Sequence, residues 1–492
     1  MTQIVASLVE RSIAGVSDSS RLAFKEGADL VECRLDHLGG LSRKTIAEAR
    51  MAILGPTIAT LRSKGEGGNS GLSSTRREQM LRAVLESDFE YVDLELDSDR
   101  RLLKEIRQEG WDSETVVSTH FTKPVSKQII MGRLKEAHAV GDIAKVAMPC
   151  EHASDALMLA SIGLGLSRRG MRYVIIGMGS QGQLTRVFAD TIGSELVYSC
   201  LPGQEAAPGQ LEVAFQSKLL HGPRTVFGLI GHPVSHSVSR PMQEAAMKEL
   251  GMLGVYLPLD FKPGTLNRWS LNTVRALGFK GLNVTIPHKG TAFELCDRMG
   301  EYANETGAVN TIRFAGSSFV GENTDVNGFS RLIDGKTHMT RDTKALVIGA
   351  GGAARSIMYV LSQRGAKTII IDIEEKRARK LATTFSARTA PLRKVLNHGG
   401  PFDLIVNCSP VGMKGVPGNP VKAVVFSPSS VFFDIIFNPP VTEAMQTAEA
   451  SGARVYGGLE MLVQQGAESF RLWTGLEPNV DVMREAARRA LA

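Results

Sequence analysis

The chain has 492 residues, more than one domain on the usual size prior, and its 43% hydrophobic and 22% charged residues are typical of a globular protein. Its formal net charge of +6 is modest, and no dense lysine and arginine run is interleaved with aromatic residues, so nucleic-acid binding is not expected. No run of about 18 uncharged apolar residues occurs, and the N-terminus lacks a signal-peptide pattern, so we expect neither a membrane span nor a leader.

Residues 1–220 alternate short apolar segments with helix-like stretches. Eight strand–helix units over roughly 200–250 residues are typical of a (β/α)8 barrel, whose functional residues lie near the C-terminal ends of the strands. The expected strands are 4–9, 29–35, 57–62, 90–96, 115–120, 142–149, 173–178 and 195–200.

The sixth of these segments, DIAKVAMP, places Lys145 in the middle of an apolar strand. Alternation puts Ile143, Lys145 and Ala147 on one face, and an ammonium group buried there without a partner would be costly. If that face lines the barrel, burial and a neighbouring cation such as Arg62 would favour the uncharged, nucleophilic amine. Lys145 is therefore a candidate for Schiff-base chemistry.

Other polar residues fall near the predicted strand ends. His120 is suited to proton transfer and Arg186 to binding a carboxylate, whereas Arg34 with Glu32 could be only a structural pair. Taken singly, each residue is more often structural, but the set on successive strands favours a functional site. Its members are Glu32, Arg34, Arg62, Glu66, His120, Lys145, Arg186 and Gln210.

The barrel pattern stops around 217–225, and a second α/β pattern follows. The pattern itself indicates a dinucleotide-binding domain at 331–455. This domain contains apolar segments at 343–352, 369–373, 403–409 and 431–435, the pattern of a doubly wound parallel sheet with a Rossmann fold.

The stretch IGAGGAARS fits a G-x-G-x-x-A motif between a strand and a helix, with Gly349, Gly351 and Ala354 at the defining positions. Backbone N–H groups there would bind a pyrophosphate. Asp372 follows at the offset of an acid that binds a ribose 2′-hydroxyl and repels a 2′-phosphate, which favours NAD over NADP although Arg377 lies nearby. The expected cofactor-binding residues are Gly349, Ala350, Gly351, Gly352, Ala353, Asp372 and Arg377.

Upstream of this motif, Lys289 and Asp325 form a plausible proton-transfer pair. Neutral amides suit a polyhydroxylated ligand, and two serines could hold a carboxylate. These residues are Asn283, Asn310 and Gln465, with Ser237 and Ser239.

Residues 1–220 resemble type I 3-dehydroquinate dehydratase in the blocks ECRLD, TLRSKGEGG, STHFTKP, DIAKVAMP, GMGSQGQLTR and APGQ. The resemblance implies that Lys145 forms the imine, that His120 is the general acid/base and that Glu66 supports proton transfer. It also implies substrate contacts from Glu32, Arg34, Arg62, Arg186 and Gln210. Cys33 and Ala206 depart from the tryptophan and serine expected at their positions.

Residues 224–492 resemble shikimate dehydrogenase, in NVTIPHKG, GAVNT, GENTDVNG, NCSPVGM and EMLVQQ. The resemblance implies a substrate-binding domain at 224–330 that is completed by 456–492. It also implies hydride transfer with Lys289 and Asp325 as the catalytic pair, a carboxylate on Ser237 and Ser239, and hydroxyl contacts from Asn283, Thr285, Asn310 and Gln465. Phe437 stands where tyrosine is common, Gln243-Glu244 replaces a histidine-containing pair, and Asp372-Ile373-Glu374 replaces an Asn-Arg-Thr-like stretch that accompanies NADP.

The two resemblances together predict a bifunctional enzyme of aromatic amino-acid biosynthesis that makes 3-dehydroshikimate and reduces it to shikimate. Two alternatives remain: an NAD-dependent quinate or shikimate dehydrogenase working in catabolism, and a non-catalytic sensor built from the same domains. Small-molecule substrates are the expected partners. Five scattered cysteines without a CxxC pair favour free thiols in a reducing cytoplasm, and no cluster has the spacing of a metal site.

Overall fold

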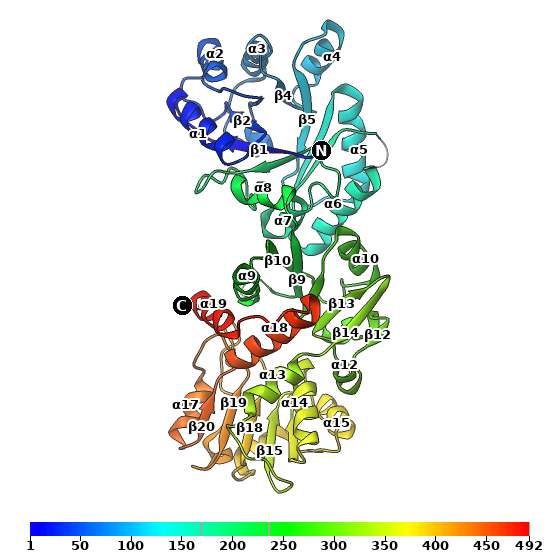
Figure 1. Ribbon diagram of the computed structural model, residues 1–492, viewed down its shortest axis with the longest axis vertical. Helices are drawn as coiled ribbons and strands as arrows, with labels where there is room; N and C mark the ends of the chain where they lie inside the picture. The colour runs from blue at the N-terminus through cyan, green and yellow to red at the C-terminus, as the bar shows by residue number, and fades with distance from the viewer. Residues whose placement is uncertain (168–169, 235–236, 492) are drawn as a thin grey trace. The chain divides into compact units, whose positions relative to one another are not determined.

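The computed structural model describes residues 1–167, 170–234 and 237–491, and they form two compact units (Figure 1). The first unit is Met1–Arg224 with the short segments Leu259–Phe261 and Trp269–Gly278, and the second contains the remaining residues. Both have the predicted α/β architecture. None of the described helices combines the length and apolarity needed to cross a membrane.

The first unit is built on eight parallel strands, and the predicted barrel is confirmed. The sheet order is β7-β6-β5-β4-β3-β2-β1-β8, and the Tyr173 carbonyl accepts a 2.8 Å hydrogen bond from the Glu195 N–H at the seam between the terminal strands. The strands are β1 Gln3–Leu8, β2 Leu30–Arg34, β3 Thr57–Thr60, β4 Tyr91–Glu95, β5 Glu114–His120, β6 Ile143–Pro149, β7 Tyr173–Met178 and β8 Leu196–Ser199.

Helices connect these strands, and several begin at a serine whose side chain accepts a hydrogen bond from the first turn. Ser12, Ser42 and Ser73 cap α1, α2 and α3 in this way, satisfying N–H groups that have no partner inside the helix. The helices are α1 Ile13–Lys25, α2 Arg43–Met51, α3 Ser74–Leu85, α4 Arg100–Glu109, α5 Lys127–Val140, α6 Ala153–Leu166, α7 Gly179–Val187 and α8 Val213–His221, with a 3-10 turn at Lys64–Glu66.

Apolar side chains from seven of the barrel strands form one buried cluster. Ile143 and Ala147 belong to it, together with Val5, Val116 and Val174 from other strands. The face of β6 that carries Lys145 therefore points into the barrel, as strand alternation predicts.

The second unit begins with a six-stranded mixed sheet of order β10-β9-β11-β13-β14-β12. Its strands are β9 Thr225–Gly231, β10 Gly254–Asp260, β11 Gly281–Val284, β12 Arg298–Met299, β13 Thr311–Ala315 and β14 Ser318–Glu322. The helices in this part of the chain are α9 Ser239–Glu249, α10 Arg268–Leu277, α11 Lys289–Leu295, α12 Glu301–Thr306 and α13 Asp325–Ile333.

A second sheet in this unit has the order β17-β16-β15-β18-β19-β20, and each of its neighbouring strands pairs in parallel, which confirms the Rossmann-type sheet. The strands are β15 Lys344–Ile348, β16 Lys367–Ile371, β17 Arg388–Thr389, β18 Leu404–Asn407, β19 Val431–Asp434 and β20 Arg454–Tyr456. The helices are α14 Gly352–Gln363, α15 Glu375–Thr384, α16 Leu392–His398 and α17 Glu443–Ala450, with a 3-10 turn at Ala423–Val425.

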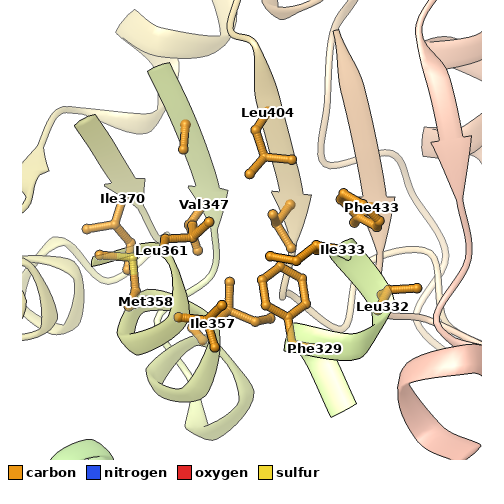
Figure 2. Close-up of a cluster of buried hydrophobic side chains, with 14 of the residues drawn as sticks. Phe329, Leu332, Ile333, Val347, Ile357, Met358, Leu361, Ile370, Leu404 and Phe433 are labelled. Carbon is orange, nitrogen blue, oxygen red and sulfur yellow. The ribbon is translucent and has the colours of Figure 1, made fainter. Parts of the chain in front are cut away.

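One face of this sheet is covered by α13 and α14. Figure 2 shows Phe329 and Ile333 from α13 and Ile357 from α14 facing the strand side chains Val347 and Phe433. Because Asp325 begins α13 and the glycine motif begins α14, this packing fixes two candidate functional segments on one rigid core.

The chain ends with α18 Leu459–Thr474 and α19 Val480–Leu491. Helix α18 packs against α13, and α19 packs against α9. Phe470 and Met483 join the buried cluster that contains Met242, so the C-terminal helices share the core of the mixed sheet.

Candidate active sites

Lys145 lies in the barrel with its ammonium group in contact with a carboxylate. Its Nζ is 2.9 Å from Oδ2 of Asp93 on β4 and 3.9 Å from the centroid of the Tyr198 ring on β8. Both the lysine and the aspartate are buried. The buried amine is thus held between an anion and the negative face of an aromatic ring.

Arg62 fixes the other oxygen of this carboxylate. Its Nη2 donates to Oδ1 of Asp93 at 2.6 Å, and the Ser118 hydroxyl donates to the same oxygen at 2.6 Å. Burial alone would raise the pKa of Asp93, but the charges of Arg62 and Lys145 hold it well below its usual range. Asp93 is therefore an anion with two fixed oxygens.

Glu66 and His120 form a second polar pair beside this group. Oε2 of Glu66 accepts from the backbone N–H of His120 at 3.0 Å and lies 2.9 Å from Nδ1 of the same residue. Burial raises the pKa of Glu66 to about 7, and burial with the nearby cations Arg62 and Lys145 lowers the pKa of His120 well below its usual value. An imidazole that stays neutral near pH 7 is suited to act as a base.

Glu32 and Gln210 meet around the hydroxyl of Ser7. Ser7 donates to Oε2 of Glu32 at 2.7 Å, and Nε2 of Gln210 donates to Ser7 at 3.3 Å. The second oxygen of Glu32 accepts from the Thr60 hydroxyl at 2.8 Å. The two oxygens of Glu32 are thus engaged by hydroxyls from the neighbouring strands, whereas its interaction with Arg34, the structural pairing that the sequence left open, is between charges.

The two remaining arginines differ in their partners. Arg34 forms a two-pronged pair with Asp36, at 2.9 and 2.8 Å, just beyond the end of β2. Arg186 on α7 is buried and donates to the Gly177 carbonyl, and burial lowers its pKa to about 10. Within the described residues, nothing accepts a hydrogen bond from its Nε, which leaves one donor of the guanidinium for a ligand.

Ala206 lacks the hydroxyl of the serine expected at its position, but its backbone contacts Gln210. Its N–H donates to Oε1 of Gln210 at 2.8 Å, which folds the loop before APGQ against the Gln210 side chain.

Sequence reasoning missed Asp93 and its neighbour Glu95, which accepts from the Ser63 N–H at 2.8 Å. The signal was present in EYVDLEL: alternation puts Tyr91, Asp93 and Glu95 on one face of a predicted barrel strand. Two carboxylates on the inner face of such a strand require cations opposite them.

In the second unit, the side chains of Lys289 and Asp325 form an ion pair. Lys289 begins α11 and Asp325 begins α13. The other oxygen of Asp325 accepts from the side-chain amide of Asn310 at 2.9 Å, and the same amide also contacts Oε1 of Gln465 at 3.2 Å. Four of the predicted residues thus lie in one cluster.

Asn283 lies beside this cluster. Its amide donates to Ser469 at 2.9 Å and its oxygen accepts from the Tyr256 hydroxyl at 2.8 Å. Ser237 donates to Ser239 at 3.0 Å at the start of α9, so these two serines lie together, while the methyl group of Thr285 packs closely over Gly231.

The glycines of the motif differ in the space around them. Gly349 has φ +100°, and a side chain there would collide with Cys408, whereas a Cβ on Gly351 would meet no atom within 4 Å. A Cβ on Gly352 would lie 3.1 Å from Cδ of Lys289, so the start of α14 borders the lysine–aspartate pair. This closeness suits transfer between a bound dinucleotide and a substrate held by the polar cluster.

Asp372 follows β16 and accepts hydrogen bonds from the backbone N–H groups of Ala350 and Glu374, both at 2.7 Å. Arg377 forms an exposed ion pair with Glu374 at 2.8 Å. Asp372 therefore contacts the backbone of the glycine motif at Ala350, and Ala353 lies in the first turn of α14.

Four family models match the chain. Residues 4–222 match type I 3-dehydroquinase, and 229–312 match the shikimate dehydrogenase substrate-binding domain. Residues 331–456 match shikimate/quinate 5-dehydrogenase, and 458–488 match the shikimate 5′-dehydrogenase C-terminal domain.

Individual proteins resemble the whole chain or its second half. The bifunctional 3-dehydroquinate dehydratase/shikimate dehydrogenase, chloroplastic, of Arabidopsis thaliana is 30% identical over 96% of this chain and 81% of its own length. The shikimate dehydrogenase (NADP(+)) of Methanopyrus kandleri is 41% identical over 53% of this chain and 94% of its own. A solved structure of quinate dehydrogenase from Corynebacterium glutamicum in complex with NAD is 30% identical to this chain, matches 54% of this chain and 100% of its own, and has a TM-score of 0.51.

Proposed function

Because the chain belongs to the family of bifunctional 3-dehydroquinate dehydratase/shikimate dehydrogenases, we propose that its first unit works through an imine on Lys145 and its second through Lys289 and Asp325. The chain is a lyase and an oxidoreductase of the shikimate pathway. Its domains are proposed to be 1–220, 224–330 completed by 456–492, and 331–455.

The observation that carries the dehydratase proposal is a buried lysine amine beside a histidine that is neutral at pH 7. Nζ of Lys145 attacks the substrate carbonyl carbon, and the carbonyl oxygen leaves as water. His120 then removes a proton from the adjacent carbon, and the electron pair moves into the imine. Glu66 orients His120 through Nδ1, which leaves Nε2 to face the substrate.

The polar residues around the lysine are proposed to bind the substrate. Arg186, which has a buried donor without a partner, is suited to the carboxylate, and Arg34, Glu32 and Gln210 are suited to hydroxyl groups. Arg62 remains a proposed contact, although its visible hydrogen bonds go to protein groups such as Asp93 and Ser118.

In the second unit, Lys289 is proposed to give a proton to the carbonyl oxygen of dehydroshikimate, with Asp325 holding its ammonium group. A bound nicotinamide dinucleotide supplies the hydride. Asn310, Asn283, Thr285 and Gln465 are proposed to bind substrate hydroxyls, because Asn310 joins Asp325 to Gln465 and Asn283 lies beside them. Ser237 and Ser239, whose hydroxyls lie together, are proposed to bind its carboxylate.

We propose NAD as the preferred cofactor, held by the loop Gly349–Ala353 and by Asp372. Two carboxylates after β16 disfavour a 2′-phosphate, and Glu374 already pairs with Arg377. The name of the Methanopyrus relative, a shikimate dehydrogenase (NADP(+)), does not support this preference, whereas the quinate dehydrogenase structure was solved with NAD. A cytoplasmic location also remains a prediction, since the Arabidopsis relative is named chloroplastic.

The experiment is to incubate the full chain with 3-dehydroquinate and sodium borohydride, followed by peptide mass spectrometry. A reduced adduct on Lys145 is expected, and an adduct elsewhere or none would reject the imine. In parallel, the full chain with 3-dehydroquinate and either reduced dinucleotide should form shikimate. The ratio of kcat/KM for NADH and NADPH, with quinate tested in the reverse direction, decides between the biosynthetic and catabolic alternatives.

A further inference from the structure

The carboxylate of Asp93 contacts Nζ of Lys145, the atom that is proposed to react. Asp93 lies on the inner face of β4, and its Oδ2 is 2.9 Å from Nζ of Lys145. Its side chain is fully buried, and that of Lys145 is only 3% exposed, so water does not screen the pair.

The second oxygen of Asp93 is held so that the carboxylate cannot turn away. Arg62 and the Ser118 hydroxyl each donate to Oδ1 at 2.6 Å, and Arg62 also donates to Ser118 at 2.9 Å. Two fixed donors on Oδ1, themselves joined by a hydrogen bond, make Asp93 a pre-organised anion, which need not reorganise when charge develops next to it.

We propose that Asp93 is a catalytic residue of the dehydratase, as the counter-ion of the cationic imine that Lys145 forms. This inference rests on the proposed imine chemistry and assigns the group that keeps the imine nitrogen protonated. A protonated imine is the form that accepts electrons, so its population limits the rate.

The charge on nitrogen changes in a defined sequence. The neutral amine adds to the carbonyl carbon, the oxygen departs as water, and the nitrogen carries a positive charge beside Asp93. When His120 removes the adjacent proton, the C–H electron pair neutralises the nitrogen and gives an enamine. Departure of the hydroxyl group as water, with a proton from His120, restores the cation, and hydrolysis returns the amine.

Other charged groups and one aromatic ring surround the Lys145–Asp93 pair from several strands of the barrel. Glu32 comes from β2, Arg62 from the end of β3, Glu66 from the turn that follows, and His120 from β5; Tyr198 contributes its ring from β8. Within the described contacts of Lys145, Asp93 is the carboxylate at hydrogen-bond distance, so it has the largest influence on the protonated nitrogen.

The test is Asp93→Asn in the full chain. Loss of the anion disfavours both the ammonium ion and the protonated imine, so the pH profile of borohydride adduct formation on Lys145 should move to lower pH by about one unit. Dehydratase kcat at the native optimum should fall about 100-fold. Adduct formation reports on the nitrogen itself, which a change in packing alone would not shift along the pH axis.

Two further variants make the result decisive. Asp99→Asn removes another buried carboxylate, one that pairs with Arg77 at 2.7 Å, and should leave the adduct pH profile in place. Asp93→Glu keeps the charge and should keep the native profile even if kcat falls.

The counter-ion role is overturned if the pH profile of adduct formation in Asp93→Asn coincides with that of the native chain. It is also overturned if Asp93→Glu shifts the profile as far as Asp93→Asn does. Absence of an adduct on Lys145 in the native chain would instead reject the proposed imine.

Discussion

Each unit contains a lysine–aspartate pair, and the two pairs differ in what surrounds them. The side chains of Lys145 and Asp93 are 3% and 0% exposed, and Asp93 also binds the cation Arg62. The side chains of Lys289 and Asp325 are 12% and 8% exposed, and the second oxygen of Asp325 binds the neutral amide of Asn310.

The difference indicates how one pair of functional groups supports two kinds of chemistry. A deeply buried lysine whose amine contacts a fixed carboxylate is suited to form a covalent imine, because that anion stabilises the cation that results. A lysine at the edge of a cluster, beside the loop that starts α14, is suited to pass a proton and recover it from water.

The largest effect is expected for Lys145→Met. Without the amine no imine forms, so dehydratase kcat should fall by at least about 10⁴-fold. The measurement is formation of dehydroshikimate by absorbance. The dehydrogenase activity of the same chain is the control and should be unchanged; comparable loss of both would contradict separate roles for the two lysines.

A smaller loss is expected for Lys289→Met, because a water molecule can replace a proton donor but not a covalent nucleophile. Dehydrogenase kcat should fall about 10³-fold while dehydratase activity stays at its native level. Steady-state assays of both reactions on one preparation measure this. Full dehydrogenase activity in this variant would rule out the proton-transfer pair.

The sequence could predict both folds because alternation in the strands and the G-x-G-x-x-A motif are local patterns. It also brought Lys145, Arg62, Glu66 and His120 to one place, since the ends of parallel strands meet at one end of a barrel. Lys289, Asp325, Asn310 and Gln465 lie together in the structure as well, as expected for a charged pair and neutral amides that accompany a dinucleotide motif.

Partner choice could not be predicted, because it depends on register between strands. Ser7 lies opposite Glu32 in the β1–β2 ladder, which explains why Glu32 binds Ser7 rather than Arg34. Asp93 was missed for a different reason. Its segment was interpreted only as a strand, although Tyr91, Asp93 and Glu95 alternate onto the inner face.

The cofactor site offers a test of a moderate effect. Asp372→Asn removes the carboxylate that repels a 2′-phosphate, and Glu374→Gln frees Arg377 to bind one. Each should raise the ratio of kcat/KM for NADP to that for NAD by about 10-fold, the equivalent of one charge contact. Glu375→Gln is the matched control, because Glu375 pairs with Arg379 at 2.8 Å on the next turn. An equal change in the control would indicate general surface charge instead of a specific contact.

The smallest effect concerns stability and the Glu66–His120 pair. With a folded-state pKa of about 7, raised from 4.5, Glu66 binds more protons in the folded protein, so its contribution to stability is lost as pH rises from about 4.5 to 7. The lowered pKa of His120 has the opposite sign, since its contribution is lost as pH falls through 6.5. Glu66→Gln removes the first of these terms, so the Tm of the variant relative to the native chain should rise by about 2–4 °C between pH 5 and 7.5 in calorimetry of the full chain. Glu86→Gln is the control, because the carboxylate of Glu86 is exposed and its Tm difference from the native chain should not depend on pH. If the Tm difference of Glu66→Gln is equally independent of pH, Glu66 titrates normally in the folded barrel.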